Sequence, residues 1–233
     1  MYLFYSKKVQ DGLIILEAEE ARHCSQVLRK QEGDLIHIVD GEGNFYDGQL
    51  TSISKRACIV KIIAIKENFQ HRNFHLHIAI APTKNINRLE WFLEKCTEIG
   101  IDEISLILCQ NSERHKVRID RLERILIAAM KQSLKAKLPK INELRSFDEK
   151  IDSIQAEQLF VAHCRDGEKI HLKDSIDSAK SLCILIGPEG DFSKAEIEKA
   201  TQKGFQAISL GESRLRTETA GIVACHIANL LNS

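Results

Sequence analysis

Two short loops carry the residue types best suited to hold a ligand. The first, GPEGD (187–191), lies between an apolar run at 181–187 and a segment that opens with Ser193 and Glu196. Its two glycines and one proline let the backbone turn sharply and present its amides to a ligand. The loop lacks the length and the Gly-Lys-Ser/Thr ending of a Walker phosphate loop. A plain connecting turn is the alternative interpretation, and these residues alone leave it open.

The second loop, LGESRLRTETA (210–220), follows the next apolar run and crowds charge around the start of a helix. It holds two arginines, Arg214 and Arg216, and two acids, Glu212 and Glu218. Such an entrance can serve only to cap and solvate a helix. Two loops of this kind after consecutive strands favour a shared pocket, because ligands bind outside the carboxyl ends of the strands in open α/β sheets.

The elements that must position these loops alternate between strand and helix. Apolar runs of strand length occupy 75–82, 103–109, 158–164, 181–187 and 207–211. Helical spacing of apolar residues occupies 88–100, 122–134 and 217–231. Ser193 and Glu196 form a capping box, which predicts a further helix directly after the first loop. This alternation predicts an α/β domain with a mainly parallel sheet.

The first 70 or so residues instead predict mostly strands. Short runs rich in β-branched or aromatic residues stand at 2–6, 35–39 and 57–65, and DGEGN (40–44) is a hairpin signal. One helix interrupts them, with an apolar stripe formed by Ala21, Cys24, Val27 and Leu28 and a stop at Gly33. The polar stretch 67–73 marks a boundary. We therefore expect a small β-barrel domain at 1–70 and an α/β domain at 74–233.

Composition sets the broad class. The chain has 233 residues, of which 43% are hydrophobic and 28% charged, as is ordinary for a globular protein. It has no apolar run suited to a signal peptide or a membrane span, which predicts a cytoplasmic protein without a membrane partner. The seven cysteines are scattered without zinc-ligand spacing, so we expect reduced core cysteines and no metal.

The zero net charge hides a basic segment. Residues 111–140 hold nine Lys/Arg against three acids, a balance of +6, whereas residues 141–210 hold nine against thirteen, a balance of −4. A basic segment inside a neutral protein can be a phosphate-binding face. It can equally be a solvated helix face, and charge alone does not separate the two.

The segment from ILIGPEGDF to GESRLRTETAGIV strongly resembles the C-terminal region of the RsmE family, 16S ribosomal RNA uridine-N3 methyltransferases of the SPOUT class. EKCTEIGIDEI, AAMKQSLKAKLPKI and VLRKQEGD (27–34) are similar to further segments of that family, so the resemblance covers essentially the whole chain. Asp191 departs from the pattern, because a second glycine is commoner there. Lys135 departs as well, where an arginine is usual.

The resemblance implies a PUA-like barrel followed by a SPOUT-type α/β domain whose C-terminal part is threaded as a trefoil knot, working as a homodimer. It implies the cofactor S-adenosyl-L-methionine and methylation of N3 of the uridine at position 1498 of 16S rRNA in the small ribosomal subunit. Carried over by motif, the cofactor pocket comprises Leu185, Gly187, Pro188, Glu189, Gly190, Leu210, Gly211, Leu215 and Arg216.

Uridine N3 carries a proton that must leave before or during methyl transfer. We expect Arg216 to stabilise the developing negative charge on uracil and Glu218 to be a candidate proton acceptor; bracing of the helix start is the alternative role of both. The expected RNA contacts are Arg22, Arg29, Lys30, Arg114, Lys116, Arg118 and Lys135. Three other functions stay open: a SPOUT methyltransferase with another RNA substrate such as tRNA, a non-catalytic RNA-binding protein on the same scaffold, and a small-molecule enzyme.

Overall fold

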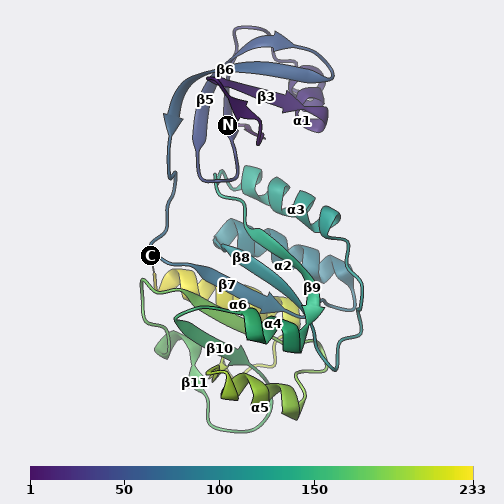
Figure 1. The fold of residues 1–233 in the computed structure, drawn as a ribbon, viewed down its shortest axis with the longest axis vertical. Coiled ribbons are helices and arrows are strands. Elements are labelled where there is room, and N and C mark those ends of the chain that lie inside the picture. The colour runs from purple at the N-terminus through teal and green to yellow at the C-terminus, as the bar shows by residue number, and fades with distance from the viewer. Residues whose placement is uncertain (233) are drawn as a thin grey trace. The chain divides into compact units, whose positions relative to one another are not determined.

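The computed structural model describes residues 1–232, and these form two compact units (Figure 1). The first unit comprises residues 1–71 together with 127–138, and the second comprises 72–126 together with 139 onward. Residues 127–138 lie inside the range expected for the α/β domain, yet they pack with the N-terminal unit. The chain therefore passes between the units three times.

The first unit is a curled six-stranded sheet. Its strands are β1 (Leu3–Tyr5), β2 (Val9–Gln10), β3 (Leu13–Glu17), β4 (Leu35–Val39), β5 (Phe45–Ile53) and β6 (Ala57–Lys66). They lie in the order β1-β4-β5-β6-β3-β2, and only β1 and β4 pair in parallel. Successive side chains of a strand point to opposite faces of the sheet, and one of these faces is buried. In β3, Ile14 and Leu16 are fully buried, while Leu13 and Ile15 are exposed.

The helix expected near residue 20 is split, and one of its predicted core positions is wrong. A short α-helix, α1 (Ala18–Arg22), continues as a π-helix (His23–Val27). At its end the Leu28 amide donates to the His23 carbonyl, five residues back, at 2.9 Å. Ala21 and Cys24 are buried as predicted, but Val27 is 63% exposed. The wider π-turn rotates Val27 away from the 3.6-residue stripe, whereas Leu28 still packs against the same core.

A second apolar cluster in this unit includes part of the returning segment. Met130 and Ala136 are buried against Leu3, Val39 and Phe45. Met130 belongs to α3 (Ile119–Gln132), which ends two residues before Leu134. Leu134 was expected on the helical stripe but has a φ of +57° and packs beside the same cluster from outside the helix.

The second unit is built on a seven-stranded parallel sheet. Its strands are β7 (Leu76–Ile80), β8 (Glu103–Leu108), β9 (Lys140–Ser146), β10 (Gln158–Ala162), β11 (Ile170–His171), β12 (Leu182–Ile186) and β13 (Gln206–Ser209). They lie in the order β11-β13-β10-β12-β7-β8-β9, and every pairing is parallel. Continuous apolar runs such as that of β12, buried at all five positions, suit a sheet covered on both faces. The α/β architecture is as predicted.

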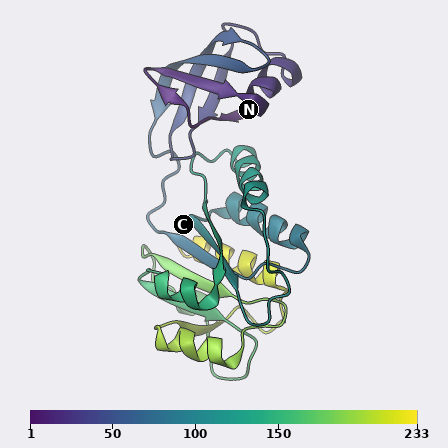
Figure 2. The same ribbon diagram turned by 45° about the vertical axis from the view of Figure 1, so that its right-hand side comes forward.

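Helices cover both faces of this sheet (Figure 2). On one face α2 (Ile86–Ile99) packs against α6 (Thr217–Leu230), where the Gly221 backbone closely approaches the Phe92 ring. On the other face lie α4 (Phe147–Ser153) and α5 (Lys194–Gln202), whose apolar residues join a core with Ala79, Cys183 and Leu185. The predicted Ser193–Glu196 capping box opens α5.

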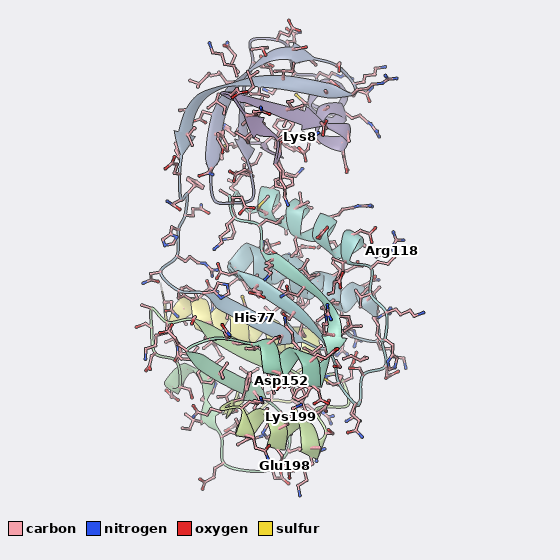
Figure 3. The ribbon with its side chains drawn as sticks, in the orientation of Figure 1. Lys8, His77, Arg118, Asp152, Glu198 and Lys199 are labelled. Atoms are coloured by element: carbon pink, nitrogen blue, oxygen red, sulfur yellow. The ribbon has the colours of Figure 1, made fainter. Side chains whose placement is uncertain are left out.

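His77, in β7 (Figure 3), belongs to a polar cluster embedded in β7, β8 and β9. His77 Nε2 lies 2.8 Å from Ser105 Oγ, and the Asn142 amide donates to Ser105 Oγ at 2.9 Å and to Glu103 at 2.6 Å. Burial lowers the pKa of His77 to about 4, with Glu103 opposing the shift. The imidazole is therefore neutral inside the fold.

No helix in the described part of the chain is long and apolar enough to cross a membrane. Within residues 1–232, no three His, Cys, Asp or Glu side chains are grouped so that they could hold a metal ion.

Candidate active site

Three loops meet at the carboxyl edge of the parallel sheet. The GPEGD loop follows β12, the LGESRLRTETA loop follows β13, and the segment 163–169 follows β10, which lies between those two strands in the sheet. Together they line a cavity of about 740 Å³. Cavities of this size suit a ligand of several hundred daltons. The site therefore lies where parallel α/β sheets bind ligands.

The first loop is shaped by close contacts. A Cβ on Gly187 would lie 3.1 Å from the Phe192 ring, which leaves little room for a side chain. Asp191 has a left-handed φ of +62°, so the residue that replaces the usual glycine adopts a backbone conformation that glycine favours. Its Oδ2 accepts from the Cys164 amide at 2.9 Å, and its Oδ1 accepts from the Phe192 amide at 2.8 Å. Asp191 thus ties this loop to the one after β10.

Hydrogen bonds to Lys84 and Asn111 hold the loop to neighbouring segments. Glu189 Oε1 accepts from the Lys84 amide at 2.9 Å, whereas Glu189 Oε2 is buried and has no hydrogen-bond partner among the described residues. The Asn111 amide donates to the carbonyls of Gly190 and Asp191 at 3.2 and 3.0 Å. A Cβ on Gly190 would lie 3.0 Å from that of Asn111, so this glycine permits the close approach.

The second loop is joined to the first at the start of α6. Thr217 Oγ1 donates to the Gly187 carbonyl at 3.0 Å, in a buried position. Gly211 has a φ of +122° and nothing within 4 Å of its Cβ direction. Arg216 precedes α6 in an extended conformation; its exposed side chain lines the cavity and makes no ion pair within residues 1–232. Its guanidinium is therefore available to a ligand.

The structure brings together seven of the nine residues expected to bind the cofactor. The cavity is lined by Gly187, Pro188, Glu189, Leu210, Gly211, Leu215 and Arg216. Leu185 is buried in β12 and packs in the core, and Gly190 faces Asn111. These two support the loop without lining the cavity.

Glu218, the expected proton acceptor, lies in the first turn of α6 and does not line the cavity. Only 4% of the residue is exposed. Its Oε1 lies 3.7 Å from Arg88 Nε, and its Oε2 has no hydrogen-bond partner among the described residues. Burying a carboxylate oxygen without a hydrogen-bond donor costs free energy. Glu218 Oε2 therefore has either a functional role or a donor that lies outside the described residues.

The residues expected to contact RNA fall into both units. Arg22, Arg29, Lys30 and Lys135 belong to the first unit, and Arg114, Lys116 and Arg118 belong to the second. Some are engaged within their own unit. The Arg114 guanidinium donates to the carbonyls of Thr83 and Lys84 at 2.9 and 2.5 Å, and Arg118 pairs with Asp120 at 2.8 Å. Arg22, Arg29 and Lys116 are exposed.

Sequence reasoning missed the third loop altogether. His163, Cys164, Arg165 and Lys169 line the cavity, although AHCRDGEKI carries no motif. Lys169 Nζ donates to the His163 carbonyl at 2.9 Å, and Arg165 Nε donates to the Phe192 carbonyl at 3.2 Å. The signal that could have found this loop is strand order: β10 pairs with both β12 and β13, so whatever follows β10 lies between the two motif loops.

Comparison with known proteins defines the class. The model of the RNA methyltransferase domain family matches residues 70–229, and that of the RNA methyltransferase PUA domain matches residues 16–63. The chain belongs to the RNA methyltransferases that join these two domains.

Its relatives define the family more narrowly. The ribosomal RNA small subunit methyltransferase E of Mesomycoplasma hyopneumoniae is 31% identical over 95% of this chain and 96% of its own length. A crystal structure described as a probable rRNA methyltransferase from Porphyromonas gingivalis is 41% identical, with a TM-score of 0.92 over 100% of this chain and 98% of its own. The methyltransferase E of Neisseria gonorrhoeae, solved bound to S-adenosyl methionine, is 25% identical, with a TM-score of 0.83 over 99% and 98%. The chain belongs to the ribosomal RNA small subunit methyltransferase E family.

Proposed function

We propose that this protein transfers a methyl group from S-adenosyl-L-methionine to N3 of one uridine in the 16S rRNA of the small ribosomal subunit, the uridine at position 1498. The observation that carries the proposal is the cavity that unites both motif loops with the Arg216 side chain, which makes no ion pair within residues 1–232. Family membership supports ribosomal RNA as the class of substrate.

The residues of the cavity fit the proposed cofactor. S-adenosylmethionine carries an ammonium group and ribose hydroxyls. Glu189 lines the cavity, and its buried Oε2 is an acceptor with no partner among the described residues. Gly187 and Gly211 line the cavity without side chains, and the Cβ direction of Gly211 is open, which favours recognition of the ligand by main-chain groups. When bound, the cofactor supplies a methyl group already activated by its sulfonium.

The protein must then orient the uracil and favour loss of its N3 proton. A guanidinium beside the base stabilises the negative charge that develops when N3 is deprotonated. Arg216 stands at the cavity with no carboxylate partner within residues 1–232, so its charge is not already neutralised. We assign it this role.

Glu218 is our proposed proton acceptor, acting through a water or after a local movement, because it is buried outside the cavity. The competing role is to brace the start of α6 through Arg88. The Glu218→Gln variant separates the two. A proton acceptor loses turnover with the fold intact, and a brace loses stability with turnover per folded molecule intact.

The experiment that tests the function is methyl transfer from labelled S-adenosylmethionine to small ribosomal subunits lacking their own modification. The product nucleoside is identified by mass spectrometry. We expect 3-methyluridine at position 1498, abolished by Arg216→Ala while cofactor binding and folding persist. Normal turnover in that variant would remove Arg216 from the mechanism. Transfer to tRNA alone would identify another RNA substrate, and cofactor binding without transfer to any RNA would favour a non-catalytic RNA-binding protein.

We propose that the RNA backbone is held by the basic side chains Arg22, Arg29, Lys30, Arg114, Lys116, Arg118 and Lys135. The exposed members can reach phosphates directly, whereas Arg114 must first release carbonyls of its own unit. Phosphate contacts make binding weaken steeply with salt. Affinity for ribosomal RNA that does not change between 50 and 200 mM salt would contradict this assignment.

We also propose a cytoplasmic homodimer with a trefoil knot at the cofactor site. The dimer is supported by apolar side chains left exposed on the α2 and α6 side of the sheet, with Trp91 45% and Leu230 63% exposed. The knot is what the family resemblance implies, and the buried Thr217–Gly187 hydrogen bond joins the two motif loops at that site. Light scattering tests the homodimer, and a monomer at micromolar concentration would contradict it.

A further inference from the structure

His163 lines the cofactor cavity. It is the first residue after β10, and β10 lies between β12 and β13, whose following loops form the rest of the cavity wall. Neither motif loop includes it. Its position therefore gives it access to a ligand held by both.

The environment of the His163 ring keeps it neutral. Burial is the main cause that lowers the pKa of His163, and the cations Lys169 and Arg165 lower it further, while Asp191 opposes them. These groups belong to the segment after β10 and to the GPEGD loop, the two elements that meet around the ring. A neutral imidazole has one nitrogen that donates and one that accepts.

The two ring nitrogens are not equivalent. Nδ1 is buried and has no hydrogen-bond partner among the described residues, whereas Nε2 is not among the buried unpartnered atoms. Burying an N–H without an acceptor costs about 1–3 kcal/mol, so the proton is better placed on Nε2, the nitrogen left to the ligand. A neutral donor also suits a cofactor that carries a sulfonium cation, which an imidazolium would repel.

We propose that His163 is a cofactor-binding residue of this site and donates a hydrogen bond from Nε2 to an oxygen or nitrogen acceptor of S-adenosylmethionine. This inference rests on the proposed function, because it takes the cofactor from there. It adds a side-chain contact from a third loop to a pocket otherwise described by two.

Calorimetric titration with S-adenosylmethionine and with its demethylated product, S-adenosylhomocysteine, tests the assignment. His163→Ala should weaken binding of both about tenfold, as expected for loss of one hydrogen bond. His163→Gln, whose amide nitrogen can reach the place of Nε2, should recover part of that loss. The matched control is His75→Ala, because His75 is exposed and lies outside the cavity lining; its affinity should equal that of the wild type.

A spectroscopic readout keeps the test independent of folding defects in the variants. Nitrogen NMR of ¹⁵N-histidine-labelled wild-type protein should find the Nε2–H tautomer of His163 and a shift of the Nε2 resonance when S-adenosylhomocysteine is added. An Nδ1–H tautomer, or a folded His163→Ala variant with wild-type affinity, would overturn the role of His163 and leave the proposed function standing. A wild type that binds neither compound would overturn both.

Discussion

Replacing Asp191 tests how the cofactor site is held in shape. Two effects act at this residue. Its φ of +62° disfavours most side chains by roughly 1 kcal/mol, and its carboxylate bridges the amides of Cys164 and Phe192. Hydrogen bonds to charged groups contribute about 1.5–3 kcal/mol when buried. Because these bonds are partly exposed, we discount them to about 1 kcal/mol each.

Three variants of Asp191 separate the backbone strain from the loss of the two hydrogen bonds. Asp191→Ala loses both bonds and keeps the left-handed strain, which gives a destabilisation of about 2 kcal/mol. Asp191→Gly loses the same bonds but relieves up to about 1 kcal/mol of strain, so its net loss is about 1 kcal/mol. Asp191→Asn keeps one oxygen acceptor and tolerates the left-handed region, and it should also lose about 1 kcal/mol.

Urea unfolding and thermal melting measure these differences. For a unit of about 150 residues, 1 kcal/mol corresponds to roughly 2–4 °C in melting temperature, so Ala should melt below Gly and Asn by roughly that amount. Binding of S-adenosylhomocysteine should weaken in all three, because the Cys164 amide is no longer held to the GPEGD loop. Alanine and glycine variants of equal stability would refute the backbone part of the reasoning. A glycine variant with wild-type stability and affinity would refute the bridging part.

Three further outcomes follow from other parts of the second unit. Gly221→Ala should destabilise the fold by about 2 kcal/mol in urea unfolding, because the new Cβ would lie 2.5 Å from Phe92 Cε2. An unchanged urea midpoint would contradict the close packing of α2 and α6. The pKa of His77 in the folded protein, about 4, lies below its value in the unfolded chain. The free energy of unfolding should therefore fall by up to about 3 kcal/mol as pH drops from about 6.5 to 4. In unfolding measured across this pH range, His77→Gln should flatten the slope. Of the seven cysteines, all within residues 1–232, only Cys164 is exposed, so a thiol reagent should modify it first. Because Cys164 lines the cavity, S-adenosylhomocysteine should slow that reaction. Equal labelling with and without ligand would contradict the place of Cys164 on the cavity wall.

The sequence predicted the parallel sheet because its buried strands are mainly apolar, as in β12, which is apolar throughout, and β8, in which only Glu103 and Ser105 are polar. β12 and β8 stand out in this way, and the Ser193–Glu196 box marked the start of α5. β9 went unnoticed, because its sequence KINELRS mixes charged and apolar residues and its burial pattern is mostly partial. An edge strand that pairs on one side only needs no continuous apolar run.

Local periodicity also failed where tertiary packing takes over. The π-turn after Arg22 moved Val27 to the surface, and a left-handed Leu134 ended the stripe of α3. The candidate site shows the same limit. Both motif loops were found from glycine, proline and charge, whereas His163 owes its position to strand order, which local residue types do not encode.

The path of α3 has a consequence for any attempt to divide this protein. Its first residues belong to the second unit, and residues 127–138 belong to the first. A fragment beginning at Arg72 would therefore carry Met130 and Ala136 without the strands that bury them. Such a fragment should aggregate, and a fragment ending at His71 should lack part of its core. Neither unit is one continuous stretch of sequence, so a domain swap between family members would have to exchange both segments together.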